Sequence, residues 1–155
     1  IFEDKGYEKL FVRHPESGEK EFEALYENAK SRLMSYDLSA CEDIVFVAKS
    51  LGTLVACKVK EELGIPASLI LFTPLPGTLE YMKSDNGIIL AAAGTKDRYL
   101  SADMLKGHCE KERISCYIEE NVGHRMEVMN DLARNLEIVG NVIGRLLECV
   151  EKGKE

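Results

Sequence analysis

Short apolar runs alternate with segments of helical periodicity along this chain, and that alternation most constrains its fold. Runs rich in apolar and β-branched residues lie at positions 9–13, 43–48, 67–73, 88–93 and 114–118. Continuous apolar runs are typical of parallel strands buried on both faces, and helices usually connect such strands in right-handed crossovers. We therefore expect a single three-layer α/β/α domain over residues 1–155, with a mainly parallel sheet of about five strands.

The intervening segments predict four helices. Apolar residues recur at helical spacing between residues 19 and 36, and a second helix from about residue 51 to 63 would end at Gly64 and Pro66. A third helix is expected near residues 101–111. Gly140 and Gly144 within the last helix would allow it to approach the sheet closely. That helix carries an apolar stripe made of Leu132, Leu136, Val139, Ile143, Leu146, Leu147 and Val150.

The run at residues 43–48 ends at a serine, and a helix-compatible segment follows at once. A strand that turns sharply into a helix lifts the side chain at the turn clear of the backbone. It also directs the first free N–H groups of the helix toward whatever that side chain attacks. This geometry suits Ser50 as a nucleophile, with the Leu51 N–H as a donor to the developing oxyanion. The structural alternative is that Ser50 only caps the following helix.

Two further polar residues follow later apolar runs. Asp97 ends a Gly-Thr-Lys-Asp sequence after the run at 88–93, and His124 follows a glycine on a short loop after the run at 114–118. The active sites of open α/β sheets lie at the carboxyl ends of the strands. We therefore expect Ser50, Asp97 and His124 to meet there, with His124 as the base and Asp97 orienting its ring.

Competing assignments exist for the acid and the base. Asp97 also suits an ordinary turn, and Asp103 is a second acid, although it lies at an expected helix start. His124 could be a surface-loop histidine. His14 and His108 are the other histidines, but neither follows a glycine on a loop after a late strand. His124 is therefore the preferred base.

The pentapeptide Ala48-Lys49-Ser50-Leu51-Gly52 resembles the nucleophile elbow of the α/β-hydrolase family, with Ala48 where that family usually has glycine. The order Ser50, Asp97, His124 is also the order in that family. The resemblance covers the chain from about Gly6 to its C-terminus. It implies a trimmed α/β-hydrolase topology and a serine hydrolase that uses these three residues as a catalytic triad.

The N-terminal region departs from the family pattern. The strand expected at residues 9–13 resembles the family's fourth strand, but the third strand, with its oxyanion loop, is not found. Either that part is absent from this sequence or the sheet is trimmed. In a trimmed sheet the loop at residues 13–18 would approach Ser50. The second oxyanion donor is unassigned in both cases.

A short connection at residues 74–87 stands where larger family members insert a lid. The resemblance therefore implies an open site and a small or surface-bound ester or thioester rather than bulk lipid. Lys49, Pro74 and Leu75 are expected to contact the substrate. Two interpretations are open for the apolar residues of this connection: they form an apolar rim beside Ser50, or they pack in the core. These residues are Pro74, Leu75, Pro76, Leu79, Tyr81 and Met82.

Composition narrows the class of protein. The net charge of −7, without a basic stripe, argues against nucleic acid and anionic membranes as partners. No apolar run approaches the ~20 residues of a membrane-spanning helix, and no secretory signal is visible. The five cysteines are scattered without a Cys-x-x-Cys pair, so neither a metal site nor a disulfide framework is indicated. Reduced thiols favour a cytoplasmic location. The oligomeric state is not determined.

These observations predict an enzyme that cleaves a small ester or thioester through an acyl-enzyme, without a metal or organic cofactor. The alternative is a binding or scaffold domain that keeps the α/β-hydrolase fold without activity. A nucleotide-binding Rossmann-like domain is disfavoured, because no Gly-x-Gly-x-x-Gly follows a strand.

Overall fold

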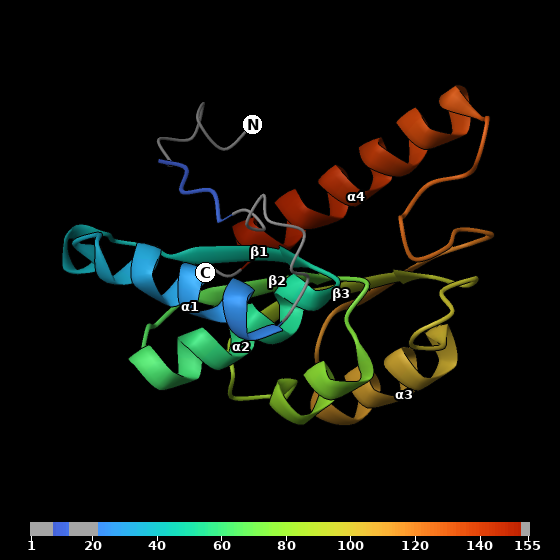
Figure 1. Ribbon diagram of the computed structural model, residues 1–155. Helices are drawn as coiled ribbons and strands as arrows, with labels where there is room; N and C mark the ends of the chain where they lie inside the picture. Colours follow the sequence, from blue (N-terminus) through green and yellow to red (C-terminus); the bar gives the residue numbers. More distant parts are fainter. Residues whose placement is uncertain (1–7, 13–21, 153–155) are drawn as a thin grey trace.

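A parallel β-sheet forms the centre of the protein in a computed structural model that describes residues 8–12 and 22–152 (Figure 1). Its four strands pair in chain order, each parallel to the next. They are β1 (Val45–Lys49), β2 (Ser68–Phe72), β3 (Ile88–Gly94) and β4 (Cys116–Glu119). The helices are α1 (Phe22–Met34), α2 (Leu51–Leu63), α3 (Ala102–Glu112) and α4 (Leu132–Lys152), with short 3₁₀ turns η2 (Leu38–Ala40) and η3 (Pro76–Tyr81).

Helices cover both faces of the sheet, as the sequence predicts. Figure 1 shows α1, α2 and α3 on one face and α4 alone on the other. Successive side chains of a strand point to opposite faces. Leu69 and Leu71 of β2 accordingly pack on the α2–α3 side, while Ile70 packs with Leu90 and with Leu146 of α4. The expected three-layer α/β/α class is therefore confirmed.

In the described residues the sheet has four strands, one fewer than the roughly five expected. Residues 9–12, the described part of the expected first strand, do not form a strand. Leu10 packs against the cluster around α1, but Phe11 and Val12 remain 60% and 37% exposed. An apolar run becomes a stable strand only when a sheet buries it, and here the run lies beside the groove along β1. Residues 13–18 lie outside the described part of the chain.

The last helix packs less closely than expected. A Cβ built on Gly140 or Gly144 would meet no atom within 4 Å, so neither glycine provides a close approach to the sheet. Figure 1 shows α4 inclined, with its first turns rising away from the strands. Leu132, Leu136 and Val139 of the expected apolar stripe are exposed, whereas Leu146 contacts the sheet. Ile138, which is outside that stripe, is only 1% exposed, so the first half of the helix buries a residue that the stripe did not include.

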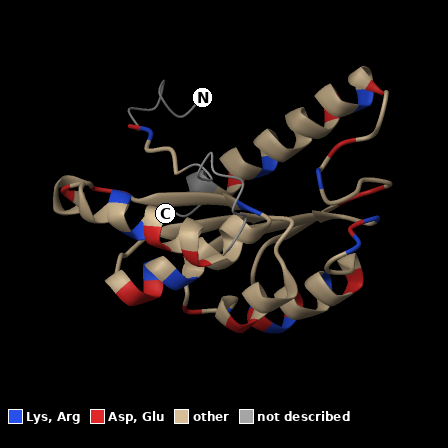
Figure 2. Ribbon diagram, viewed as in Figure 1, with Lys and Arg blue, Asp and Glu red and all other residues tan. Residues whose placement is uncertain are grey.

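The charged residues lie mainly on helices and loops. Figure 2 shows both signs interspersed along α1, α2 and α3, while the strands are largely free of charge. No helix in the described residues is both long enough and apolar enough to cross a bilayer. Within the same residues, histidines, cysteines and carboxylates do not gather into a group of three or more that could hold a metal ion.

Candidate active site

The connection between β1 and α2 consists of one residue, Ser50. Its backbone dihedrals, φ 54° and ψ −126°, lie in a region that residues with a side chain rarely occupy. Such a conformation costs on the order of 1–3 kcal/mol and persists only where surrounding contacts hold it. The Ser50 N–H donates to the Phe72 carbonyl at 3.0 Å, which holds the turn against β2. The Ser50 hydroxyl makes no capping bond to α2, so the structural alternative of a helix cap is wrong.

Two buried threonines, Thr53 of α2 and Thr78 of η3, stabilise the turn at Ser50. The Thr53 hydroxyl donates to the Ser50 carbonyl at 2.6 Å and lies 2.9 Å from the Thr78 hydroxyl in η3. Both threonines are fully buried. The sequence indicates no role for either residue, because their pairing depends on how the 74–87 connection folds over α2.

The structure brings Ser50, Asp97 and His124 together at the carboxyl ends of β1, β3 and β4. His124 Nε2 lies 2.7 Å from the Ser50 Oγ, and His124 Nδ1 lies 2.8 Å from the Asp97 Oδ2. In this arrangement the serine hydroxyl donates to Nε2, and Nδ1–H donates to the carboxylate. The Asp97 side chain is fully buried and that of His124 is 18% exposed. The base is thus held by the acid while its other nitrogen faces the serine.

The competing acid and base lie elsewhere. Asp103 is exposed in the first turn of α3, where it suits the helix dipole. His108 lies on the same helix, and its Nε2 is 2.7 Å from the Met82 carbonyl oxygen. This contact ties α3 to the chain after η3. His14 is outside the described residues. Among the described histidines, His124 is the one that meets the serine.

Gly94 at the end of β3 allows the acid and base loops to approach each other. A Cβ at this position would lie 2.5 Å from the carbonyl carbon of Val122 and closer still to its oxygen. Beside this contact the Lys96 N–H donates to the Val122 carbonyl at 2.8 Å. Val122 precedes His124 by two residues, so this backbone contact fixes where the histidine loop begins. In the sequence, Gly94 is recognisable only as part of a turn.

No family model matches the chain, and no curated protein matches it. Three solved structures match it, two of them with a TM-score above 0.5. An alpha-beta serine hydrolase homologue from Coxiella burnetii matches at 16% identity with a TM-score of 0.55, over 72% of this chain and 58% of its own. The chain has the α/β-hydrolase fold. A YdeN-like hydrolase from Pectobacterium atrosepticum matches at 16% identity with a TM-score of 0.52, over 73% of this chain and 63% of its own. The chain thus spans less than two thirds of either neighbour.

An aromatic residue that the sequence did not indicate contacts His124. The Tyr99 ring packs edge-on against His124, with 4.5 Å between ring centroids and 60° between planes. The Tyr99 N–H also donates to the Asp97 Oδ1 at 2.9 Å, and the Arg98 guanidinium donates to the Tyr99 hydroxyl at 2.9 Å. Both carboxylate oxygens of Asp97 are therefore engaged. No spacing rule in the sequence marks a ring that packs on a histidine, so the sequence did not identify Tyr99.

The three expected substrate contacts occupy different environments. Lys49 Nζ donates to the Arg125 carbonyl at 2.7 Å. Partial burial lowers the pKa of Lys49, Glu127 opposes this shift, and Arg125 adds to it. Pro74 is buried and Leu75 is half-buried. Of the proposed apolar rim, Leu79, Tyr81 and Met82 pack against the main core instead, which is the ordinary packing alternative.

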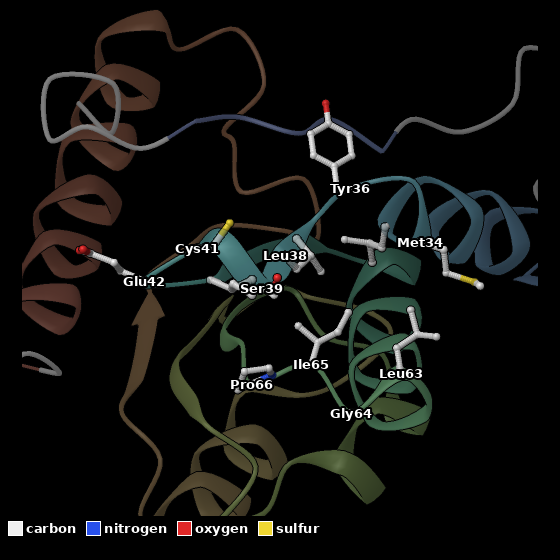
Figure 3. Close-up of a pocket in the computed structure, with 12 residues that line it drawn as sticks. Met34, Tyr36, Leu38, Ser39, Cys41, Glu42, Leu63, Gly64, Ile65 and Pro66 are labelled. Atoms are coloured by element: carbon white, nitrogen blue, oxygen red, sulfur yellow. The ribbon is translucent and has the colours of Figure 1, made fainter.

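One cavity lies along β1, and a second lies near the residue before its start, Ile44. A groove of about 690 Å³ runs beside the strand from Asp43 to Ser50, with Phe11 and Val12 among its lining residues. A second cavity of about 490 Å³ lies at the opposite end of the strands and contains no residue of the Ser50 site. Figure 3 shows its lining side chains, which include Tyr36, Leu38, Ile65 and Pro66. The first groove is therefore the one that leads to the serine.

Proposed function

We propose that this chain is a serine hydrolase that cleaves a small ester or thioester through an acyl-enzyme at Ser50. The observation that carries the proposal is the continuous hydrogen-bonded series from the Ser50 hydroxyl through His124 to Asp97. The strained backbone of Ser50 and the hydrolase fold of the two neighbours support it. A serine hydroxyl is a weak nucleophile until a neighbouring base accepts its proton.

The reaction would proceed in two displacements. The Ser50 Oγ attacks the substrate carbonyl carbon as His124 Nε2 accepts the hydroxyl proton, and Asp97 stabilises the imidazolium. His124 then returns the proton to the leaving alcohol or thiol, the bond to that group breaks, and an acyl-serine remains. Water attacks the acyl-serine with His124 again accepting a proton, and the acid product leaves as Ser50 regains its hydrogen. These steps need neither a metal nor an organic cofactor.

The developing oxyanion requires hydrogen-bond donors. Leu51 begins α2, so its N–H is one of the first amides of a helix and lies next to the nucleophile in the chain. Removing one oxyanion donor typically costs ~100–1000-fold in turnover rate, so a second donor is expected to matter equally. The second donor is unassigned, and the loop expected to approach Ser50, residues 13–18, lies outside the described residues.

A fluorophosphonate probe tests the proposal directly, because it reacts only with a serine that has an activated oxygen. We expect labelling of the folded wild-type chain at Ser50 and none of Ser50→Ala. Ser101→Ala is the matched control, since the Ser101 hydroxyl accepts from the Met104 N–H as the cap of α3 and its loss should leave labelling unchanged. A folded wild-type sample that resists the probe would contradict the hydrolase proposal and favour a binding domain that keeps this fold.

A further inference from the structure

We propose that Lys49 is a positioning residue that holds His124 in place relative to Ser50. This inference rests on the proposed function. It reassigns Lys49, which the sequence pattern suggested as a substrate contact, to the support of the catalytic base. The observation behind it is the hydrogen bond from the Lys49 ammonium to the Arg125 carbonyl at 2.7 Å.

The position of this bond in the chain is what makes it informative. Lys49 is the residue before Ser50, and Arg125 is the residue after His124. The bond therefore links the two segments that must stay 2.7 Å apart at their reacting atoms, although they are separated by 74 residues. A contact between immediate neighbours of two reacting groups limits their relative motion more than a contact farther along either segment.

The histidine loop is held on both sides of His124. On the upstream side, the Lys96 N–H donates to the Val122 carbonyl, which attaches the loop to the segment carrying Asp97. On the downstream side, the Met126 N–H closes a turn with the Gly123 carbonyl, and Lys49 attaches that turn to β1. The base is thus held toward the acid from one side and toward the nucleophile from the other.

The backbone of the His124 loop is strained, so it depends on contacts such as the bond from Lys49. Asn121 and Met126, on either side of His124, both have positive φ values of 62° and 61°. Residues with side chains adopt this region only where surrounding contacts hold them. A lysine ammonium that donates to a carbonyl forms a charge-assisted bond, which is stronger than one between neutral groups.

The surroundings of the ammonium group favour this role over substrate binding. Lys49 lies on the same face of β1 as Val45, which packs against the cluster that contains Leu146 of α4. Lys49 is exposed as a residue, but partial shielding lowers the pKa of its ammonium, and the charges of Glu127 and Arg125 act on it. Since the Nζ already donates to the Arg125 carbonyl, a substrate would have to compete with that contact.

The first test compares Lys49→Met, which keeps the length of the side chain, with Lys49→Arg, which keeps a donor. We measure fluorophosphonate labelling as a function of probe concentration, with Lys106→Met as the control because Lys106 is exposed on α3. The maximal labelling rate of Lys49→Met should fall about 10–100-fold, while the half-saturating concentration stays within about twofold. Lys49→Arg should recover most of the rate, and Lys106→Met should match the wild type.

Three results of this comparison would overturn the inference. A higher half-saturating concentration with an unchanged maximal rate would make Lys49 a substrate contact. A wild-type rate in Lys49→Met would show that the bond has no role in positioning. A rate loss accompanied by an equal loss in Lys49→Arg and a large fall in melting temperature would make Lys49 merely structural.

A second measurement keeps the inference separate from the proposed function. The Nδ1 proton of His124, shared with Asp97, should give a downfield NMR signal in the wild type, assigned by its absence in His124→Gln. The signal should broaden or vanish in Lys49→Met and persist in Lys49→Arg, even if the wild type resists the probe. An unchanged signal in Lys49→Met would refute the positioning role whether or not the chain is an enzyme.

Discussion

Replacing Gly94 with alanine should disable the site without touching any of its three polar residues. The added Cβ would lie 2.5 Å from the carbonyl carbon of Val122, whereas carbon atoms in contact are normally about 3.5 Å apart or more. The segment at Val122 must therefore move by about 1 Å. His124 lies two residues farther on, and its Nε2 is now 2.7 Å from the Ser50 Oγ. A shift of that size carries the pair beyond good hydrogen-bond geometry.

The stability change can be worked out from the same contacts. Overpacking of a well-packed region costs about 1–3 kcal/mol, and loss of the bond from Lys96 to Val122 adds about 1 kcal/mol. For a chain of this size, each kcal/mol lowers the melting temperature by roughly 2–4 °C. We therefore expect Gly94→Ala to melt roughly 4–16 °C lower than the wild type. Its labelling rate with a fluorophosphonate should fall about 100-fold, because a 1 Å misplacement has effects of that order.

Gly107→Ala is the matched control. Gly107 lies inside α3, and a Cβ built there would meet no atom within 4 Å. Alanine favours a helix interior over glycine by roughly 0.8–1 kcal/mol, so this variant should melt slightly higher and keep the wild-type labelling rate. A Gly94→Ala variant with the melting temperature and the labelling rate of the wild type would refute this expectation. So would a Gly107→Ala variant that loses as much stability as Gly94→Ala.

Three further expectations follow from the site and the core. His124→Ala should abolish labelling by the probe while leaving the melting temperature nearly unchanged; a large loss of stability would mean that the histidine is mainly structural. In a series of p-nitrophenyl esters, short acyl chains should be cleaved fastest, because the segment after β2 packs into the core rather than covering Ser50; a rate that climbs steadily with chain length would instead indicate that the groove along β1 binds the acyl group. Burial raises the pKa of the Cys57 thiol to about 12, so the folded state keeps a proton that the unfolded state loses near pH 9. The stability that the protonated Cys57 thiol contributes is therefore complete below about pH 9 and is lost as the pH rises toward 12. Between about pH 8 and 11, the free energy of unfolding measured in urea should decline less in Cys57→Ala than in the wild type. Equal declines in the two proteins would contradict this account.

Local patterns predicted most of the element order. The apolar runs at β1 to β4 and the helical periodicity of α1 to α4 each depend on residues close together in the chain, and all eight elements formed. The exception at residues 8–12 shows the limit of this reasoning. Leu10, Phe11 and Val12 have the composition of a strand, but a strand also needs a sheet on which to bury its side chains.

In the candidate site, too, local patterns identified some residues and only contacts between distant segments revealed the others. Ser50, Asp97 and His124 could be identified because each follows an apolar run, and the carboxyl ends of parallel strands share one edge of the sheet. Tyr99, Thr53 and Thr78 could not, because no spacing rule marks a ring that packs on a histidine or a hydroxyl that supports a turn from another element. Their roles depend on contacts between distant segments.

The amino-acid sequence alone determined the alternation of strands and helices and the positions of the serine, the carboxylate and the imidazole in the chain. Both follow from short-range periodicity and from turn chemistry. Only the tertiary structure decided that Gly94 lets two backbones touch and that the Lys49 side chain reaches the Arg125 carbonyl. These contacts join residues 28 and 76 positions apart (94 to 122 and 49 to 125), and packing in three dimensions sets such distances, which no local pattern encodes.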